Sequence, residues 1–438
     1  MNIAMFTNTF RPHIGGVAHS VTWLADSLRG AGHSVLVVAP EFPGYSADEP
    51  GVVRIPAVQN FRGSDFSVPI PLTRLLHDEL EEFAPDLVHS HHPFLLGDTA
   101  LRAAASFDLP IIYTYHTRYE LYGHYVAQDA PLLQRLVLSL ALGYCDLCDA
   151  VVAPSASMAG FLAEHGVETP VTVAPTGIEI ARFDSGSRAV ARAVAGIPED
   201  AFVVGHVGRL APEKNLDYLA QALHRFLEVE TTAHFLVVGD GPMKGPIWEL
   251  FIANGLAGRV HMTGALEGDR LADMYAAMDV FAFSSHSETQ GLVLAEAMAA
   301  GVPVVALDAF GTREVVRDCL NGRLLSGDAS VGLFAEALRS IARMDTKDRQ
   351  ASRRAARRTA QLFTRERSTL KVLDLYHSLT RARAKDKVVE QGLWHTTKRR
   401  LEQEWKILGN VAHAIGDAVF AESATASTSK DKCAPGSF

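Results

Sequence analysis

Short apolar runs alternate with longer stretches whose apolar residues recur at helical spacing. In the first half of the chain the apolar runs cover residues 1–6, 34–39, 87–89, 111–114 and 151–153. In the second half they cover residues 202–208, 235–238, 260–262, 280–283 and 302–306. Short buried strands that alternate with helices are typical of parallel sheets with helices on both faces. The pattern therefore predicts an α/β protein with two doubly wound parallel sheets.

Breaks in this alternation divide the chain into segments. A polar, turn-rich stretch at residues 184–188 suits a link between two domains. The predicted segments are a first domain (1–176), a linker (177–200), a second domain (201–362), a terminal helix (363–385), an amphipathic extension (386–420) and a tail (421–438). The tail is rich in Ser, Thr and Ala, so we expect it to be disordered.

Apolar residues in the extension recur at intervals of three, four and seven. They are Trp394, Leu401, Trp405, Leu408, Ala412, Ile415 and Val419. Basic residues occupy the remaining surface of its first half, at Lys398, Arg399, Arg400 and Lys406. A basic amphipathic helix with tryptophans fits a membrane surface. Docking on the protein's own surface or on a second subunit fits the same pattern, so these alternatives stay open.

Composition and charge narrow the class of protein. With 438 residues, of which 48% are hydrophobic, the chain can bury substantial cores, and its length suggests two or three domains. The net charge of −9 gives no indication of a nucleic-acid partner. No apolar run reaches the ~18 residues that suggest a membrane span, and no signal-type segment opens the chain. The four cysteines agree with a reducing compartment. We therefore expect a cytoplasmic protein.

The stretch 280–299 predicts a strand, a turn and a helix, and it carries the most informative chemistry. Gly291 stands where the turn opens the helix, so the backbone N–H groups of Gly291, Leu292 and Val293 are expected to point outward. An anionic or hydroxyl-rich ligand fits there. Glu288 lies in the turn and Glu296 two turns into the helix. An ordinary amphipathic helix of an α/β domain can also carry such glutamates, so this stretch alone does not decide the function.

Residues 288–292 (ETQGL) and 296–305 (EAMAAGVPVV) together closely resemble a known family signature. It is the C-terminal signature of retaining nucleotide-sugar glycosyltransferases of the group 1 type, which have the GT-B fold. The resemblance implies two Rossmann-like domains that face a cleft, with the last helix crossing back to the first domain. It also implies that Glu296 binds the ribose hydroxyls and that Glu288 binds the donor sugar. Thr289 and the backbone of residues 290–293 would complete the cradle for sugar and phosphate.

Gly15 and Gly16 follow the first predicted strand and precede a helix predicted over residues 21–31. Glycines at such a point allow the backbone to approach a phosphate closely, and a plain tight turn is the alternative. The resemblance places them against the diphosphate of the donor. The loop lacks the G-x-G-x-x-G pattern with a following acidic residue, which argues against a dinucleotide oxidoreductase.

Arg209 and Lys214 follow the first strand of the second sheet. Two cations beside a helix terminus suit a diphosphate, and they stabilise the charge that builds on it as the sugar–oxygen bond breaks. Two surface cations near a helix cap are the plainer explanation, but the pair closely resembles the Arg-x4-Lys pair of the family. No Asp-x-Asp stands at a strand end to hold a divalent ion. We therefore expect transfer without a metal or cofactor, with Leu266 near the nucleobase by resemblance.

His116 follows the strand 111–114, where the family places a histidine near the donor sugar. A structural histidine is the alternative. Residues 113–125 and 6–12 resemble the subgroup that glycosylates diacylglycerol or related lipids. The predicted acceptor-side residues are Tyr119, Glu120, Tyr122 and His124. A metal site at the three histidines of residues 89–92 is not expected, because adjacent side chains in an extended segment point apart.

These observations predict a retaining hexosyltransferase with His116, Arg209, Lys214 and Glu288 as its catalytic residues. It would move glucose or mannose from a UDP or GDP sugar to a lipid hydroxyl such as that of diacylglycerol, at the inner face of the membrane. Retention is implied by resemblance only, so double displacement and same-face attack both stay open. The other functions that fit are transfer to a soluble acceptor (sugar phosphate, inositol or oligosaccharide), sugar-nucleotide hydrolysis or epimerisation, and sugar-nucleotide binding without catalysis. The sequence does not indicate the oligomeric state.

Overall fold

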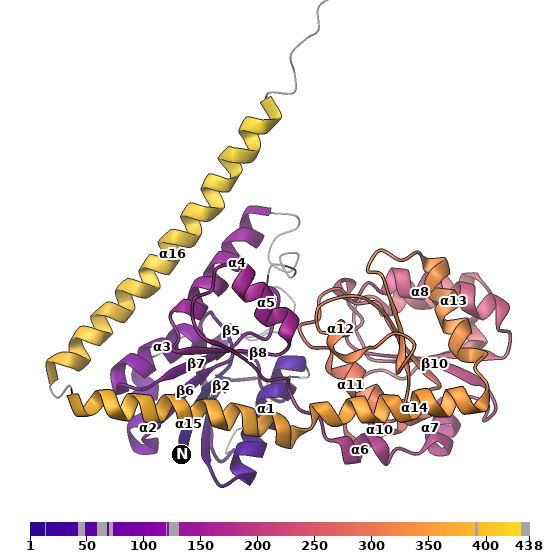
Figure 1. The fold of residues 1–438 in the computed structure, drawn as a ribbon, viewed down its shortest axis with the longest axis horizontal. Helices are drawn as coiled ribbons and strands as arrows, with labels where there is room; N and C mark the ends of the chain where they lie inside the picture. Colours follow the sequence, from indigo (N-terminus) through magenta and orange to yellow (C-terminus); the bar gives the residue numbers. More distant parts are fainter. Residues whose placement is uncertain are drawn as a thin grey trace, which may run out of the picture. The chain divides into compact units, whose positions relative to one another are not determined.

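The computed structural model describes residues 1–13, 15–42, 49–58, 68–69, 73–119, 121, 131–389 and 393–430. The chain forms two compact units (Figure 1). The first contains Met1–Pro154, Ala159–Ala174 and the chain from Thr369 onward, and the second contains Ser155–Met158 and Pro175–Ser368. Each unit is built around its own parallel sheet, so the prediction of two α/β domains with doubly wound parallel sheets is confirmed.

The first unit has a seven-stranded sheet in the order β3-β2-β1-β6-β7-β8-β9, in which all neighbouring strands are parallel. Its strands are β1 (Asn2–Phe6), β2 (Ser34–Pro40), β3 (Val52–Ile55), β6 (Leu87–Ser90), β7 (Ile111–Thr114), β8 (Ala150–Ala153) and β9 (Val171–Val173). A separate antiparallel pair consists of β4 (Ala57–Val58) and β5 (Val68–Pro69). The helices before the second unit are α1 (Gly16–Gly30), α2 (Thr73–Phe83), α3 (Leu96–Phe107), α4 (Pro131–Asp146) and α5 (Ala156–Glu164). Because the strands are parallel, the loops after β1, β6 and β7 leave the same edge of the sheet.

The second unit has a six-stranded parallel sheet in the order β12-β11-β10-β13-β14-β15. Its strands are β10 (Phe202–Val207), β11 (Ala233–Val238), β12 (Val260–Met262), β13 (Val280–Phe283), β14 (Val304–Leu307) and β15 (Gly322–Leu325). Its α-helices are α6 (Ile180–Asp184), α7 (Arg188–Ala195), α8 (Leu216–Val229), α9 (Lys244–Ala253), α10 (Gly268–Ala277), α11 (Leu292–Ala299), α12 (Thr312–Val315), α13 (Val331–Ala342) and α14 (Thr346–Ala360). Short 3₁₀ turns occur at η3 (Pro212–Lys214), η4 (Ala257–Arg259) and η5 (Gln361–Phe363). As in the first unit, the loops after the parallel strands share one edge.

Helix α1 begins at Gly16, five residues before the start predicted from the sequence. Its buried apolar residues, Ala18, Val21, Ala25 and Leu28, recur at helical spacing from the first turn on. The prediction was wrong at this end because glycine is a poor helix former, which hid the start of the pattern.

Two long helices end the chain, α15 (Arg365–Val389) and α16 (Leu393–Lys430). Val372 and Tyr376 of α15 are buried in the core of the first unit, against residues such as Met5 and Val37. The predicted return of the terminal helix to the first domain is therefore confirmed. Helix α16 packs along α3 and α4 (Figure 1). It continues to Lys430, so residues 421–430 are helical and not part of the expected disordered tail. Alanines at 421, 424 and 426 favour continuation of a helix that has already formed.

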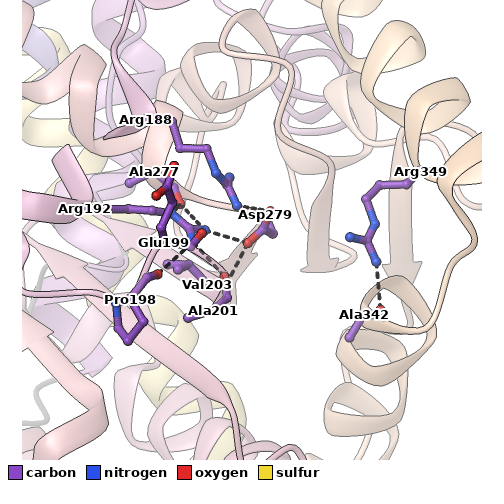
Figure 2. A network of polar contacts seen from close by, with 10 residues as sticks. All are labelled: Arg188, Arg192, Pro198, Glu199, Ala201, Val203, Ala277, Asp279, Ala342 and Arg349. Atoms are coloured by element: carbon purple, nitrogen blue, oxygen red, sulfur yellow. Dashed lines mark hydrogen bonds and ion pairs between the residues drawn. The ribbon is translucent and has the colours of Figure 1, made fainter. Parts of the chain in front are cut away.

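Arg192 of α7 is almost completely buried and is the centre of a polar network in the second unit (Figure 2). Its Nη2 donates to Asp279 Oδ2 over 2.9 Å. Further hydrogen bonds reach the backbone carbonyls of Ala277, Pro198, Glu199 and Ala201. Asp279 also accepts from Arg188 and from the backbone N–H of Val203. A buried guanidinium with this many acceptors ties α7 to the start of two strands.

We expect Arg192→Met to lower the free energy of unfolding by about 3–5 kcal/mol, because a buried carboxylate loses its buried cation. The measurement is denaturant unfolding of the full chain. Arg354→Met, at an exposed position on α14, is the control and should change little. Equal unfolding midpoints for the two variants would contradict the role assigned to Arg192.

Candidate active site

The loops that follow β10 and β13 bring together two of the residues predicted for the site. Arg209 follows β10, and Lys214 ends the turn η3. Lys214 Nζ donates to Glu288 Oε1 over 2.5 Å, and each of these two side chains is 18% exposed. Lys214 was expected in the first turn of the next helix, but it precedes α8, with Asn215 in the left-handed conformation between them (φ 55°). Lys214 nevertheless lies at the edge of the sheet, in the loop after β10.

Small polar side chains tie these two loops together. Ser284 Oγ donates to the backbone carbonyls of Lys214 and Asn215, both over 3.0 Å. Asn215 Nδ2 donates to the carbonyl of Ser284 over 3.3 Å, and Ser287 Oγ donates to the carbonyl of Glu213 over 3.3 Å. These residues were not predicted from the sequence, although a run of serines follows β13 directly. Their bonds fix the backbone on both sides of the Lys214–Glu288 pair.

A side-chain amide and a serine hydroxyl hold the turn before α11, and the backbone N–H groups at the start of the helix remain available to a ligand. The amide of Gln290 pairs with the peptide of Thr176, accepting over 2.6 Å and donating over 2.7 Å. The carbonyl of Thr289 accepts from Ser155 Oγ over 2.7 Å. Gly291 caps the helix with a φ of 74°, a conformation that favours glycine. In the part of the chain that is described, the N–H groups of Gly291, Leu292 and Val293 have no acceptor, so this end of α11 can accept an anion.

Glu296 lies inside the unit, on α11, and only 7% of it is exposed. Its Oε2 accepts a hydrogen bond of 2.8 Å from the hydroxyl of Tyr275 on α10. Burial raises the pKa of Glu296 to about 7, and the bond from Tyr275 opposes that rise. Tyr275 was not predicted, because nothing in the sequence relates a tyrosine on one helix to a carboxylate on the next.

Leu266 is half-buried in the loop after β12. This loop is joined to the loop after β11, because Gly239 N donates to the carbonyl of Gly264 over 2.9 Å. A Cβ at Gly239 would lie 1.9 Å from the carbonyl oxygen of Gly208, so glycine is required at this crossing. The loops after β10, β11 and β12 therefore approach one another at their backbones.

Gly15 and Gly16 lie at the start of α1 in the first unit. Gly15 has an extended backbone (φ −178°), which any residue can adopt. A Cβ at Gly16 would have no atom of the protein within 4 Å. Neither backbone conformation nor close packing requires glycine at 16, and its missing side chain leaves open space beside the first turn of a helix.

Three buried histidines, His89, His91 and His92, form one group with the half-buried His116 in the first unit. His91 Nδ1 lies 2.9 Å from His116 Nε2, and the ring centroids of His89 and His91 are 4.1 Å apart. His89 lies 2.5 Å from the hydroxyl of Tyr376 and 2.7 Å from Thr114 Oγ1. His92 Nδ1 accepts from the backbone N–H of Asn8 over 3.0 Å. The histidines after β6 therefore connect the loops after β1 and β7.

Burial lowers the pKa of each histidine in this group. The pKa is about 3 for His89, His92 and His116, and it is well below the ordinary value for His91. At neutral pH all four rings are uncharged, so they can donate and accept hydrogen bonds but carry no cation. Among the described residues, no group of three or more His, Cys, Asp or Glu is placed to hold a metal ion.

Of the four residues predicted for the acceptor side, Tyr119 is the one that lies within the described part of the chain. Its ring lies edge-on to Phe94 at 5.4 Å and to Tyr115 at 6.1 Å between centroids. Glu120, Tyr122 and His124 lie outside the described residues. The predicted residues thus fall into two sets. Gly15, Gly16, His116 and Tyr119 belong to the first unit, and all those from Arg209 to Glu296 belong to the second.

Two family models match the chain, Glycosyltransferase Family 4 over residues 14–182 and Glycosyl transferases group 1 over residues 187–359. A GDP-mannose-dependent alpha-mannosyltransferase of Mycobacterium tuberculosis is 31% identical over 365 residues, which cover 82% of this chain and 92% of that protein. The chain belongs to the family of GT-B glycosyltransferases that these two models describe. It is a retaining hexosyltransferase that uses nucleotide-sugar donors.

This glycosyltransferase is also similar to a glycolipid synthase in sequence and to a UDP-glucose complex in structure. The alpha-monoglucosyldiacylglycerol synthase of Streptococcus pneumoniae is 29% identical over 370 residues, 83% of each chain. The structure of Anabaena HepE in complex with UDP-glucose matches 86% of this chain and 100% of that one, with a TM-score of 0.69 and 20% identity. The shared architecture confirms the predicted GT-B fold.

The histidine group predicts a loss of stability in acid. Below pH 6.5 an unfolded chain protonates these histidines, whereas the native protein keeps them neutral down to about pH 3. Stability should therefore fall as the pH falls below 6.5, by about 2 kcal/mol per histidine at pH 5. The measurement is the unfolding midpoint at pH values between 5 and 8.

His92→Asn should make this pH dependence shallower, since its amide oxygen can accept the Asn8 N–H without titrating. The matched control is His413→Asn on α16, at an exposed position, which should leave the slope unchanged. An identical slope in wild type and His92→Asn would show that His92 does not contribute.

Proposed function

We propose that the enzyme transfers a hexose, glucose or mannose, from a UDP or GDP sugar to the hydroxyl of a membrane lipid such as diacylglycerol. The observation that carries the donor part is the Lys214–Glu288 pair beside the open N-terminus of α11. The Lys214 cation can bind a phosphate oxygen, the Glu288 carboxylate can accept from sugar hydroxyls, and the outward N–H groups can bind the anionic diphosphate. Glu296 supplies a further acceptor for ribose hydroxyls.

The roles follow from the charges that develop during transfer. Arg209 and Lys214 stabilise the leaving diphosphate, in place of a metal ion, more in the transition state than in the ground state. Without donor, Lys214 and Glu288 neutralise each other. When donor binds, Lys214 turns to phosphate oxygen and Glu288 to sugar hydroxyls. Gly15 and Gly16 give the diphosphate room, and His116, as a neutral ring, hydrogen-bonds a sugar hydroxyl.

The acceptor is proposed from the relatives and from the sequence of the first unit. The pneumococcal relative is named for a glucosyldiacylglycerol, and it spans most of the chain. The tyrosine-rich stretch 113–125 is similar to that subgroup. A diacylglycerol stays in the bilayer, because extracting it would expose apolar chains at roughly 0.8 kcal/mol per CH₂. The enzyme must therefore reach the inner face of the membrane as a peripheral, cytoplasmic protein. Within the described ranges no helix combines the length and apolar character needed to cross a membrane.

Helix α16 has two faces with different surroundings. The inner face packs on the first unit, with Ile407, Ala414 and Ala418 buried. Polar contacts hold this face, including Glu404 with Arg102 over 2.6 Å and Asn410 with the carbonyl of Leu140 over 3.2 Å. Four members of the apolar stripe identified in the sequence, Leu401, Trp405, Leu408 and Ile415, are exposed, Trp405 by 75%. The helix as a whole therefore docks on the protein's own surface, which was one of the alternatives, but it does so through other residues than these four.

Membrane contact explains the exposed stripe. Large apolar side chains in such a row are unfavourable in water, by roughly 1.5–3 kcal/mol each when fully exposed. Lys398, Arg400 and Lys406 are exposed on the same helix, and each contributes about 1 kcal/mol near an anionic lipid surface. A local basic, apolar helix overcomes the repulsion between a chain of net charge −9 and anionic lipids.

The direct test of the proposed function is a screen of UDP and GDP sugars against lipid and soluble acceptors, with products identified by mass. A glycosylated lipid supports the proposal. Transfer only to a soluble acceptor contradicts the lipid part, and release of free sugar alone contradicts the transfer.

We expect Arg209→Ala and Lys214→Ala each to lower turnover about tenfold or more while leaving the unfolding midpoint nearly unchanged. Each variant removes a charge-assisted contact worth roughly 1.5–3 kcal/mol. Lys244→Ala is a suitable control, because Lys244 pairs with exposed Asp240 on the surface. Wild-type turnover in both variants would contradict the diphosphate assignment. Loss of wild-type activity in EDTA, restored by Mg²⁺, would contradict the replacement of a metal by these cations.

We expect the double variant Trp405→Ser/Leu408→Ser to bind anionic vesicles at least tenfold more weakly, with less lipid glycosylation and unchanged nucleotide binding. These substitutions are preferable to deletion of α16, which would uncover the surface that Ile407 and Ala414 bury. Val194→Ser/Val229→Ser, at exposed positions of the second unit, is the control. If vesicle binding is unchanged and a dimer of the wild type dissociates in the Trp405 variant, the stripe contacts a second copy instead.

A further inference from the structure

Tyr275 is a buried tyrosine whose hydroxyl is hydrogen-bonded, within the described part of the chain, to a side chain of the proposed donor site. Its hydroxyl donates to Glu296 Oε2 over 2.8 Å. The ring is completely buried and is held edge-on to Phe183, with 5.6 Å between centroids, and tilted against Phe281 at 5.9 Å. These contacts hold the ring, so the core of the second unit positions its hydroxyl.

The two oxygens of Glu296 are in different situations. Oε2 is occupied by Tyr275, whereas Oε1 has no hydrogen-bond partner among the described residues. Oε1 is not fully buried, so it is open to solvent and can accept a hydrogen bond from a ligand. Ribose offers two neighbouring hydroxyl donors.

We propose that Tyr275 is a positioning residue of the donor site, which holds one oxygen of Glu296 so that the other is presented to the ribose hydroxyls. The inference rests on the proposed role of Glu296 in nucleotide binding. Tyr275 itself does not contact the donor. It fixes the rotamer of the carboxylate and supplies its hydrogen bond within the protein.

The same bond also affects the protonation of Glu296. Burial raises the pKa of Glu296 to about 7, and Tyr275 is the group that lowers it. The helices packed against α11 also carry charges, namely Arg182 and Asp184 (α6), Arg313 and Glu314 (α12), and Lys347, Asp348, Arg349, Arg353, Arg354, Arg357 and Arg358 (α14). None of these charged groups contributes to the shift of Glu296. Because the charged carboxylate is the better acceptor, nucleotide affinity should fall as the pH falls through about 7.

The test is calorimetric titration of the full chain with UDP and GDP, and with 2′,3′-dideoxy forms of whichever binds. Tyr275→Phe should weaken binding of the ribonucleotide about five- to tenfold, the upper part of the range expected for the loss of one ordinary hydrogen bond, since Tyr275 acts on the ribose only through Glu296. It should leave the affinity for the dideoxy nucleotide unchanged. In turnover, the KM for the donor should rise while kcat stays near the wild-type value. The midpoint of the pH dependence of affinity should move upward.

Two variants serve as controls. Tyr218→Phe on α8 removes a hydroxyl that donates to the carbonyl of Ala329 over 2.8 Å, away from the site, and should change none of these quantities. Glu296→Gln should abolish the pH dependence, and adding Tyr275→Phe to it should weaken ribonucleotide binding no further.

The outcomes separate this inference from the proposed function. If Tyr275→Phe weakens the ribonucleotide and the dideoxy nucleotide equally, Tyr275 is structural and the inference is wrong. If Glu296→Gln weakens ribonucleotide binding but Tyr275→Phe does not, the inference fails and the role of Glu296 stands. If wild type binds neither UDP nor GDP, the proposed donor class fails, and the inference fails with it.

Discussion

The hydrogen bonds between the loops after β10 and β13 hold Lys214 and Glu288 within 2.5 Å of each other. The two residues are distant in sequence, and only a parallel sheet in which β10 and β13 are neighbours brings their loops to one edge. The arrangement of the proposed donor site therefore depends on strand order. Hydrogen bonds from short polar side chains such as Ser284 then fix the distance between the two loops, which strand order alone does not determine.

In both units burial favours the uncharged form of ionisable side chains. It raises the pKa of Glu296 in the second unit and lowers those of His89 and His116 in the first. In each case a hydrogen bond between buried side chains keeps the group oriented, from Tyr275 to Glu296 and between His91 and His116. Burial thus sets the protonation of these groups, and the hydrogen bonds set their orientation.

Helix α16 shows how one amphipathic segment can serve two surfaces. Its small buried residues, Ala414 and Ala418, allow close packing on the first unit. Its large apolar residues, including Trp405, lie on an exposed face. Ion pairs such as Glu404 with Arg102 stabilise the docked face against solvent. The first unit can therefore hold the helix in place while leaving the tryptophan available for another surface.

The sequence by itself determined the class of fold and the local elements around the site. The alternation of apolar runs predicted both parallel sheets, and the turn before α11 with Gly291 at its cap was expected where it occurs. Local elements are predictable because periodicity and glycine conformation act within a few residues. The start of α1 and the end of α16 were missed, because helix limits depend on packing as well as on propensity.

Only the tertiary structure decided which side chains meet. Tyr275 and Glu296 are 21 residues apart, His91 and His116 are 25 apart, and His89 and Tyr376 are 287 apart. The sequence placed each of these residues on an element but carried no signal of its partner. It likewise found the apolar stripe of α16, but not which side of the helix docks. Such contacts arise from long-range packing. Packing fixes the distances between elements, whereas the local sequence pattern acts only within each element.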